Sequence, residues 1–176
     1  MVSWLYEVAY ALFLIFPAYV ANAIPVLFGG GRAIDGGRTM RDGKPIFGSH
    51  KTIRGFVAGV VAGTLTGAVE MMVLQSIRPS FSPPYDFSIL LGFLISLGAL
   101  AGDLVHSFVK RRLSLREGSS LPVADQLDFV VGALLLSAIV SPPPLLTVAL
   151  ILVITLPTHL LTNFVAYVLR VKKTPW

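Results

Sequence analysis

The chain has 176 residues, of which 55% are hydrophobic and only 13% are charged. A soluble globular domain usually carries about 25% charged residues, so this composition excludes a chain that is solvated on every side. The net charge of +5 favours anionic lipid headgroups and a phosphorylated substrate as partners, rather than nucleic acid, because the chain is so apolar. The absence of cysteine excludes disulfides and thiol catalysis.

The hydrophobic residues gather into long uninterrupted runs. Spanning the hydrocarbon core of a bilayer takes about 20 mostly apolar helical residues. We therefore predict an all-α, multi-pass integral membrane protein with one transmembrane domain and five transmembrane helices, at about 3–27, 54–76, 86–110, 124–141 and 144–170. The first run lacks a basic region and a small-residue cleavage site, which indicates a retained helix rather than a signal peptide.

Positive charge is distributed unevenly over the connections between these helices. Every Lys and Arg residue except Arg78 lies in or beside the loops at about 28–53 and 111–123, or after the fifth helix. The positive-inside rule then predicts that both loops and the C-terminus are cytoplasmic and that the N-terminus is outside. A pure topology signal would explain this sidedness, but it would not explain the acidic residues that accompany the charges.

Three aspartates are predicted to lie at one depth near the cytoplasmic face. Asp103 precedes the end of the third helix by about two turns, and a carboxylate at that depth is costly unless it faces a cavity, a cation or a metal. Asp125 and Asp128 open the fourth helix on a shared face. The helix dipole could account for Asp125 alone, and an ion pair with Arg111 or Lys51 could account for Asp103 alone.

Three carboxylates beside many basic residues suit Mg²⁺ bound to a polyphosphate. Mg²⁺ is usually held by a few carboxylates together with substrate phosphates, while Lys and Arg neutralise the remaining phosphate oxygens. A site for an anion alone would not contain three acids, and a site for a metal alone would not need so many bases. The combination favours a metal–nucleotide or metal–pyrophosphate complex.

Glycines in the first loop and second helix have two different interpretations. Those at 29–31, 36, 37, 43 and 48 let backbone N–H groups approach phosphate, although a mobile loop has the same composition. The Lys51-Thr52 end is similar to that of a P-loop, but the glycine spacing is wrong and no strand precedes it, so that interpretation is rejected. Glycines at 55, 59, 63 and 67 predict a close helix-packing face.

Four isolated polar residues receive simpler interpretations. His106 and His159 are interpreted as packing histidines, although His106 lies one turn beyond an aspartate. Glu70 is expected to reach the outer interface, and Asn22 is a buried polar residue near the cytoplasmic end of the first helix.

The two loops and their flanking helices contain a series of short motifs. Around the second loop these are Gly102-Asp103, Ser107-Phe108-Val109-Lys110-Arg111, Arg116-Glu117-Gly118-Ser119, Leu121-Pro122 and Asp125-Gln126-Leu127-Asp128. This series resembles the signature of CDP-diglyceride synthases, which are phosphatidate cytidylyltransferases. It departs from the family pattern where Arg116-Glu117 replaces a Lys-Asp pair, where Gln126 replaces an arginine, and where a His-Gly-Gly before the last acid pair is missing.

A second series of motifs surrounds the first loop. It comprises Asn22-Ala23-Ile24-Pro25-Val26, Gly29-Gly30-Gly31, Ile34-Asp35-Gly36-Gly37, Asp42-Gly43-Lys44 and Lys51-Thr52-Ile53-Arg54-Gly55-Phe56. With the small size of the chain, this series resembles the archaeal branch of the superfamily, the CDP-archaeol synthases. The resemblance implies transfer of CMP from CTP to the phosphate of 2,3-bis-O-geranylgeranylglycerol 1-phosphate, with release of pyrophosphate.

The resemblance also implies roles for particular residues. Asp103, Asp125 and Asp128 would hold one or two Mg²⁺ ions, and Lys110 and Arg111 would complete the catalytic set. Contacts to the nucleotide and its phosphates are expected from Asn22, Lys44, Gly48, Lys51, Thr52, Arg54, Ser107 and Pro122. No general base is needed, because a phosphate monoester is already ionised near pH 7.

Three other functions are considered beside this one. The first is a cytidylyltransferase that acts on acyl phosphatidate, which the sequence does not separate from an ether-lipid enzyme. The second is a small ion or metabolite transporter, which is disfavoured because no internal repeat or mid-membrane site is visible. The third is a CDP-alcohol phosphotransferase, whose Asp-Gly-x-x-Ala-Arg motif is absent. Whether the chain forms a homodimer stays open.

Overall fold

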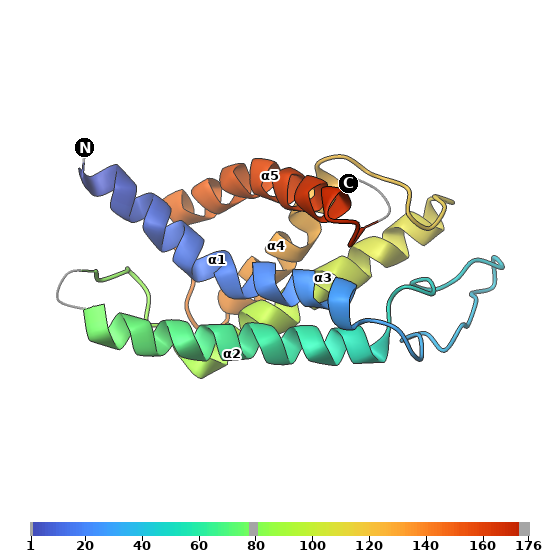
Figure 1. Ribbon diagram of the computed structural model, residues 1–176, viewed down its shortest axis with the longest axis horizontal. Helices are drawn as coiled ribbons and strands as arrows, with labels where there is room; N and C mark the ends of the chain where they lie inside the picture. The colour runs from blue at the N-terminus through green and yellow to red at the C-terminus, as the bar shows by residue number, and fades with distance from the viewer. Residues whose placement is uncertain (1, 78–80, 173–176) are drawn as a thin grey trace.

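The computed structural model describes residues 2–77 and 81–172, and it is all-helical, as predicted (Figure 1). Its five helices are α1 (Val2–Phe28), α2 (Ile53–Ile77), α3 (Ile89–Arg112), α4 (Ala124–Ser137) and α5 (Leu145–Val168). The helix expected at 86–110 begins later, because the Ser88 side chain caps it by accepting a hydrogen bond from Leu91 N. Arg78 and Lys173, which entered the charge argument, lie outside the described residues.

Four of the described helices are long and apolar enough to cross a membrane: α1 from Trp4, α2, α3 and α5. With 14 residues, α4 is shorter than the segment 124–141 expected for it. At 1.5 Å per residue its helical part is about 21 Å long, which is less than the roughly 30 Å of a hydrocarbon core. The Pro142–Pro144 run that follows keeps the chain from continuing as a helix.

Glycines on one face of α2 bring its backbone against α1 and α3. A Cβ at Gly63 would lie 2.8 Å from the carbonyl oxygen of Pro17, and one at Gly67 would lie 2.7 Å from the Cα of Gly92. No larger side chain fits at these distances, so the prediction of a close packing face is confirmed. Glu70, on the same helix, is only 7% exposed, so it packs inside the bundle, and its expected depth at the outer interface stays a prediction.

The second tight contact joins α3 to α4. A Cβ at Gly98 would lie 2.9 Å from the Cα of Ala133, and one at Gly132 would lie 2.9 Å from the Cα of Gly102. Glycine is therefore required on both sides of this contact. The contact fixes the height of α4 against α3, and it thereby sets the positions of the acidic residues on the two helices.

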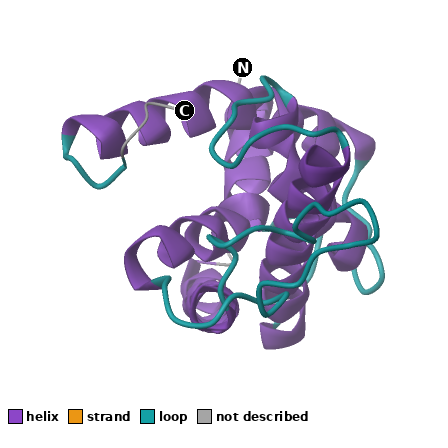
Figure 2. Ribbon diagram, turned by 90° about the vertical axis from the view of Figure 1, so that its right-hand side faces the viewer, coloured by secondary structure: helices purple, strands orange, loops and turns teal. Residues whose placement is uncertain are grey.

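The long connections meet at one end of the molecule. Figure 1 shows residues 29–52 and 113–123 at the end away from the N-terminus. Among the described residues, α5 packs on α1 and α4 but not on α2 or α3, and its C-terminal end projects from the other helices in Figure 2.

Candidate active site

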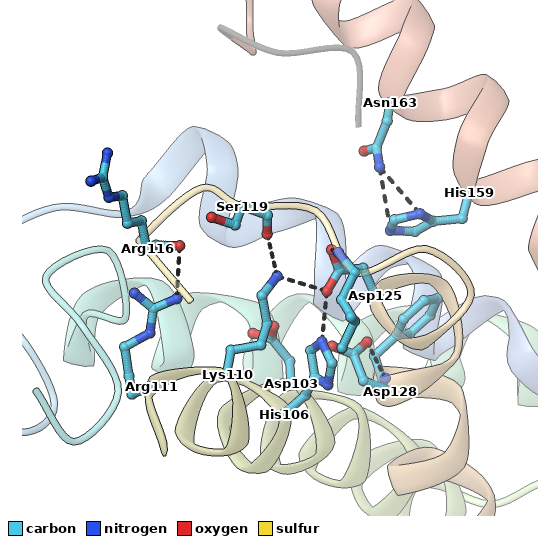
Figure 3. A network of polar contacts seen from close by, with 12 residues as sticks. Asp103, His106, Lys110, Arg111, Arg116, Ser119, Asp125, Asp128, His159 and Asn163 are labelled. Atoms are coloured by element: carbon cyan, nitrogen blue, oxygen red, sulfur yellow. Dashed lines mark hydrogen bonds and ion pairs between the residues drawn. The ribbon is translucent and has the colours of Figure 1, made fainter. Parts of the chain in front are cut away.

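The three aspartates predicted to form the site come together between α3 and α4 (Figure 3). The backbone contact at Gly102 places Asp103 beside the first two turns of α4. The negative charges of Asp103 and Asp125 both act on Asp128. Three partly buried carboxylates repel one another, and nearby cations offset this repulsion. The structure supplies two such cations.

The first cation is Lys51, at the end of the first loop. Its Nζ donates to Oδ1 and Oδ2 of Asp103 at 2.6 and 2.5 Å. Of the two partners considered for this aspartate, Lys51 is therefore the one that pairs with it. Arg111 instead donates to the backbone oxygen of Arg116 at 3.1 Å, and it is 7% exposed.

The second cation is Lys110, on α3. Its Nζ donates to Oδ1 of Asp125 at 2.8 Å and to the backbone oxygen of Ser119 at 2.6 Å. His106, interpreted above as a packing histidine, contacts the same Oδ1 through Nε2 at 2.6 Å. The other carboxylate oxygen accepts from Leu121 N at 2.7 Å, so the end of the second loop contributes as well.

Asp128 has fewer partners than the other two aspartates. Its Oδ1 accepts from Phe129 N at 2.6 Å, and it forms no salt bridge with another residue in the described parts of the chain. The Lys51 charge acts on it from the neighbouring ion pair. Asp128 is therefore less compensated by cations than Asp103 and Asp125.

The first loop is held in one conformation by Asp35. This buried carboxylate accepts from the backbone N–H groups of Gly37, Phe47 and Gly48 at 2.9, 3.0 and 3.2 Å. Burial alone would raise the pKa of Asp35, but the three backbone donors outweigh it and hold the pKa below its ordinary value. The loop therefore has a defined internal structure, unlike a mobile glycine-rich linker.

Two contacts that the sequence analysis missed join this loop to the end of α3 and to the second loop. Arg112 Nη1 donates to both oxygens of Asp42 at 2.7 and 2.6 Å, and Glu117 accepts from the N–H and the hydroxyl of Ser49 at 3.2 and 2.8 Å. Partial burial would raise the pKa of Glu117, but the bonds from Ser49 outweigh it and hold the pKa below its ordinary value. For the contact between Arg112 and Asp42, the opposite charges of the two residues were the available signal.

The other residues expected to bind phosphate lie around this core in structural roles. Lys44 Nζ donates to the Ser114 hydroxyl at 2.6 Å, and Arg54 Nε donates to the backbone oxygen of Phe28 at 2.9 Å. Thr52 Oγ1 accepts from Gly55 N at 3.2 Å and so caps α2. Gly48 has a φ of +110°, a region that favours glycine, and it lies against the Glu117 side chain.

Three more residues of the expected set lie on the helices and at a helix entry. Asn22 and Ser107 are half-buried on α1 and α3, and Pro122 is exposed just before α4. The structure thus brings Lys51 into direct contact with Asp103 and Lys110 into direct contact with Asp125, whereas Lys44 and Arg54 contact loop and helix ends.

The donor set fits a divalent cation in chemistry. Carboxylate oxygens are the ligands that Mg²⁺ prefers, and the Lys51 ammonium already lies on both oxygens of Asp103 as a cation would. Within residues 2–77 and 81–172, however, no group of three or more His, Cys, Asp or Glu side chains is arranged to hold a metal. A metal at the aspartates would displace this ammonium.

Comparison with known proteins places the chain in a family. Residues 4–176 match the family described as CarS-like CDP-archaeol synthase. The CDP-archaeol synthase of Methanopyrus kandleri is 45% identical, over 99% of this chain and 96% of its own. That of Methanococcoides burtonii is 43% identical, over 91% and 99%.

A solved structure of similar sequence and fold also matches the chain. It was reported as structural insight into an intramembrane enzyme for archaeal membrane lipids biosynthesis. It matches with a TM-score of 0.76 and 36% identity, over 87% of this chain and 92% of that chain. The resemblance found in the loop motifs is confirmed, and the chain belongs to the CDP-archaeol synthase family.

Proposed function

We propose that this protein transfers CMP from CTP to the phosphate of 2,3-bis-O-geranylgeranylglycerol 1-phosphate, which yields a CDP-archaeol-type lipid and pyrophosphate. Membership of the family supports the reaction. The observation that carries it at the site is the cluster of three aspartates with Lys51 and Lys110, built at one end of helices that are able to cross a membrane. Such a cluster suits a charged polyphosphate at a membrane surface.

The chemistry is a displacement at phosphorus. An oxygen of the lipid phosphate forms a bond to the α-phosphorus of CTP, and the bond from this phosphorus to the bridging β-phosphate oxygen breaks. Pyrophosphate leaves with that electron pair. The lipid phosphate carries most of its second negative charge at pH 7, since its second pKa is about 6, so no proton has to be removed.

Catalysis then depends on position and on charge. When the triphosphate binds, its oxygens compete with Asp103 and Asp125 for the ammonium groups of Lys51 and Lys110. Because both lysines already point into the site, little reorganisation is needed. The three aspartates would hold Mg²⁺, which when bound supplies neutralisation of the phosphate oxygens.

The orientation in the membrane is part of the proposal. In it all five helices cross the bilayer, with the N-terminus outside and with both loops and the C-terminus in the cytoplasm, where CTP is present. The location of every described Lys and Arg residue in the two loops, at their borders or after α5 supports this orientation. The residues 138–141 after α4, which form a turn, would complete its short crossing.

The test is CTP-dependent release of pyrophosphate by the purified protein in lipid nanodiscs, with the ether lipid phosphate as acceptor. We expect release that requires Mg²⁺ and that is lost in Asp128→Asn. Asp86→Asn, in the connection between α2 and α3, is the matched control and should keep its activity. No release with either the ether lipid phosphate or acyl phosphatidate would refute the proposal, and faster release with phosphatidate would assign the acyl substrate instead.

A further inference from the structure

A second polar cluster faces the aspartates from α5. His159 and Asn163 are four residues apart and share one face of this largely apolar helix. The amide nitrogen of Asn163 lies 3.2 Å from Nδ1 of His159, and its Oδ1 accepts from Lys172 Nζ at 2.8 Å. Because Lys172 can only donate, the amide oxygen must face it, and the amide N–H group must face the imidazole.

This cluster borders the site from the side opposite α3. The His159 ring packs on Phe129, with ring centroids 5.8 Å apart, and Phe129 directly follows Asp128 on α4. Figure 3 shows His159 and Asn163 across from the labelled aspartates. The charges of Lys51, Asp125 and Asp103 all act on Lys172, so the ammonium is electrostatically part of the same site.

The end of α5 also lies where a lipid headgroup would be. Lys172 comes four residues after Val168, the last residue of this membrane helix. Large apolar side chains on the outer surface of its last turns are exposed, namely Leu160, Leu161, Phe164 and Val165. A lipid whose chains lie along this surface would present its phosphate near Lys172.

The proposed reaction needs two anion-binding positions. The entering oxygen and the leaving oxygen lie on opposite sides of the α-phosphorus, and both belong to phosphates. Lys51 and Lys110 lie on the α3 side of the aspartates, and Lys172 lies on the α5 side. Two cations on one side alone would not hold both phosphates in line.

We propose that Lys172 binds the phosphate of the lipid substrate, and that Asn163 and His159 position it for this role, while the cations on the α3 side bind the triphosphate of CTP. This inference rests on the proposed function. Asn163 is suited to the task because its amide is neutral, so its hydrogen bond orients the ammonium without cancelling its charge.

The test separates the two substrates kinetically. KM for the lipid phosphate and KM for CTP are measured for the wild type, Lys172→Met, Lys172→Arg and the control Arg170→Met, all in nanodiscs. We expect Lys172→Met to raise KM for the lipid phosphate about tenfold or more, as expected for a lost charge-assisted hydrogen bond. KM for CTP should stay within about twofold, Lys172→Arg should recover most of the loss, and Arg170→Met should match the wild type.

A lipid inhibitor shows whether the loss is specific to the phosphate. The corresponding isoprenoid glycerol diether without phosphate should compete with the substrate equally well in the wild type and in Lys172→Met, since only the apolar chains bind. Asn163→Asp, which places a negative charge beside the ammonium, should also raise KM for the lipid phosphate.

Three results would overturn the inference: an unchanged KM for the lipid phosphate in Lys172→Met, an equal rise in KM for CTP, or the same rise in Arg170→Met. The last would indicate general attraction of anionic lipid to basic residues. An inactive wild type would instead refute the proposed function, and this inference with it.

Discussion

Replacing Gly102 by alanine puts a methyl group into the backbone contact that positions Asp128. A Cβ at Gly102 would lie 3.2 Å from the carbonyl carbon of Asp128, and closer than 3.0 Å to the carbonyl oxygen. Ordinary van der Waals contact begins at 3.4 Å, so α4 has to move away from α3 by at least 0.4 Å. Overpacking of this kind costs about 1–3 kcal/mol of stability.

The catalytic effect follows from the same displacement. A 1 Å misplacement of a catalytic group can cost about 100-fold in rate, so a shift of 0.4 Å or more should lower kcat for CMP transfer by about 10- to 100-fold. Gly67→Ala is the control, because a Cβ there would lie 2.7 Å from Gly92 Cα, which is also a backbone clash, but at the contact between α2 and α3, away from the aspartates.

The assay is kcat per folded protein, with the folded fraction taken from thermal unfolding in detergent. Both variants should melt at lower temperature, and only Gly102→Ala should lose turnover beyond its loss of folded protein. Equal losses of turnover in the two variants, or wild-type turnover in Gly102→Ala, would show that the contact does not set the catalytic geometry.

Three further changes test other parts of the structure. Lys51→Met removes the ammonium from Asp103, so we expect KM for CTP to rise about tenfold and the half-saturating Mg²⁺ concentration to fall; a rise in the latter would contradict competition for the carboxylate. Glu70→Met removes a carboxylate whose Oε2 is buried without a hydrogen-bond partner in the described residues, so the melting temperature should rise by an amount equivalent to about 1–3 kcal/mol, and a lower one would indicate a missed partner. The lowered pKa of Asp35 means that its clamp stabilises the first loop above the ordinary pKa of 3.8 and is lost as the pH falls through the lower folded-state value. Protease cleavage between residues 29 and 52 should therefore accelerate in that acidic range for the wild type and already be fast at pH 7 in Asp35→Asn, and equal rates for the two at pH 7 would exclude the clamp.

The helices could be predicted from the sequence because each depends on a long local run of apolar residues. Their ends were less predictable, since single contacts set them. The Ser88 side chain begins α3, and the chain leaves α4 at Ser137, before Pro142. The packing face of α2 was also predictable, because glycine at every fourth position has little other use in a membrane helix.

The sequence predicted which residue types form the site, but it did not predict which acid pairs with which base. The depth of Asp103 identified it, yet Lys51 and Arg111 were equally available as its partner in the sequence. The choice depends on how the first loop folds back on α3, which the Asp35 hydrogen bonds decide over a separation of 13 residues. His106 was missed for a similar reason, since its contact with Asp125 depends on the approach of α4 to α3.

The α5 cluster was the part of the proposed site that was hardest to predict from the sequence. His159 and Asn163 do show a signal, because two polar residues four apart in an apolar helix share one face. Lys172, however, reaches Asn163 only because the chain turns back after α5, where Arg170 has a φ of +59°. A left-handed residue other than glycine is uncommon, and nothing in the local sequence predicts it.

The pairing of acids and bases has a consequence for how the substrates bind. A polyphosphate that arrived alone would draw Lys51 and Lys110 away and leave Asp103 and Asp125 without counter-charges. A divalent cation that arrived alone would displace the same ammonium groups and leave them unpaired. Either partial exchange leaves partly buried charges uncompensated, which is strongly unfavourable. Only a nucleotide and a cation that bind together would exchange both sets of partners at once, so we expect the proposed reaction to take them up as one complex.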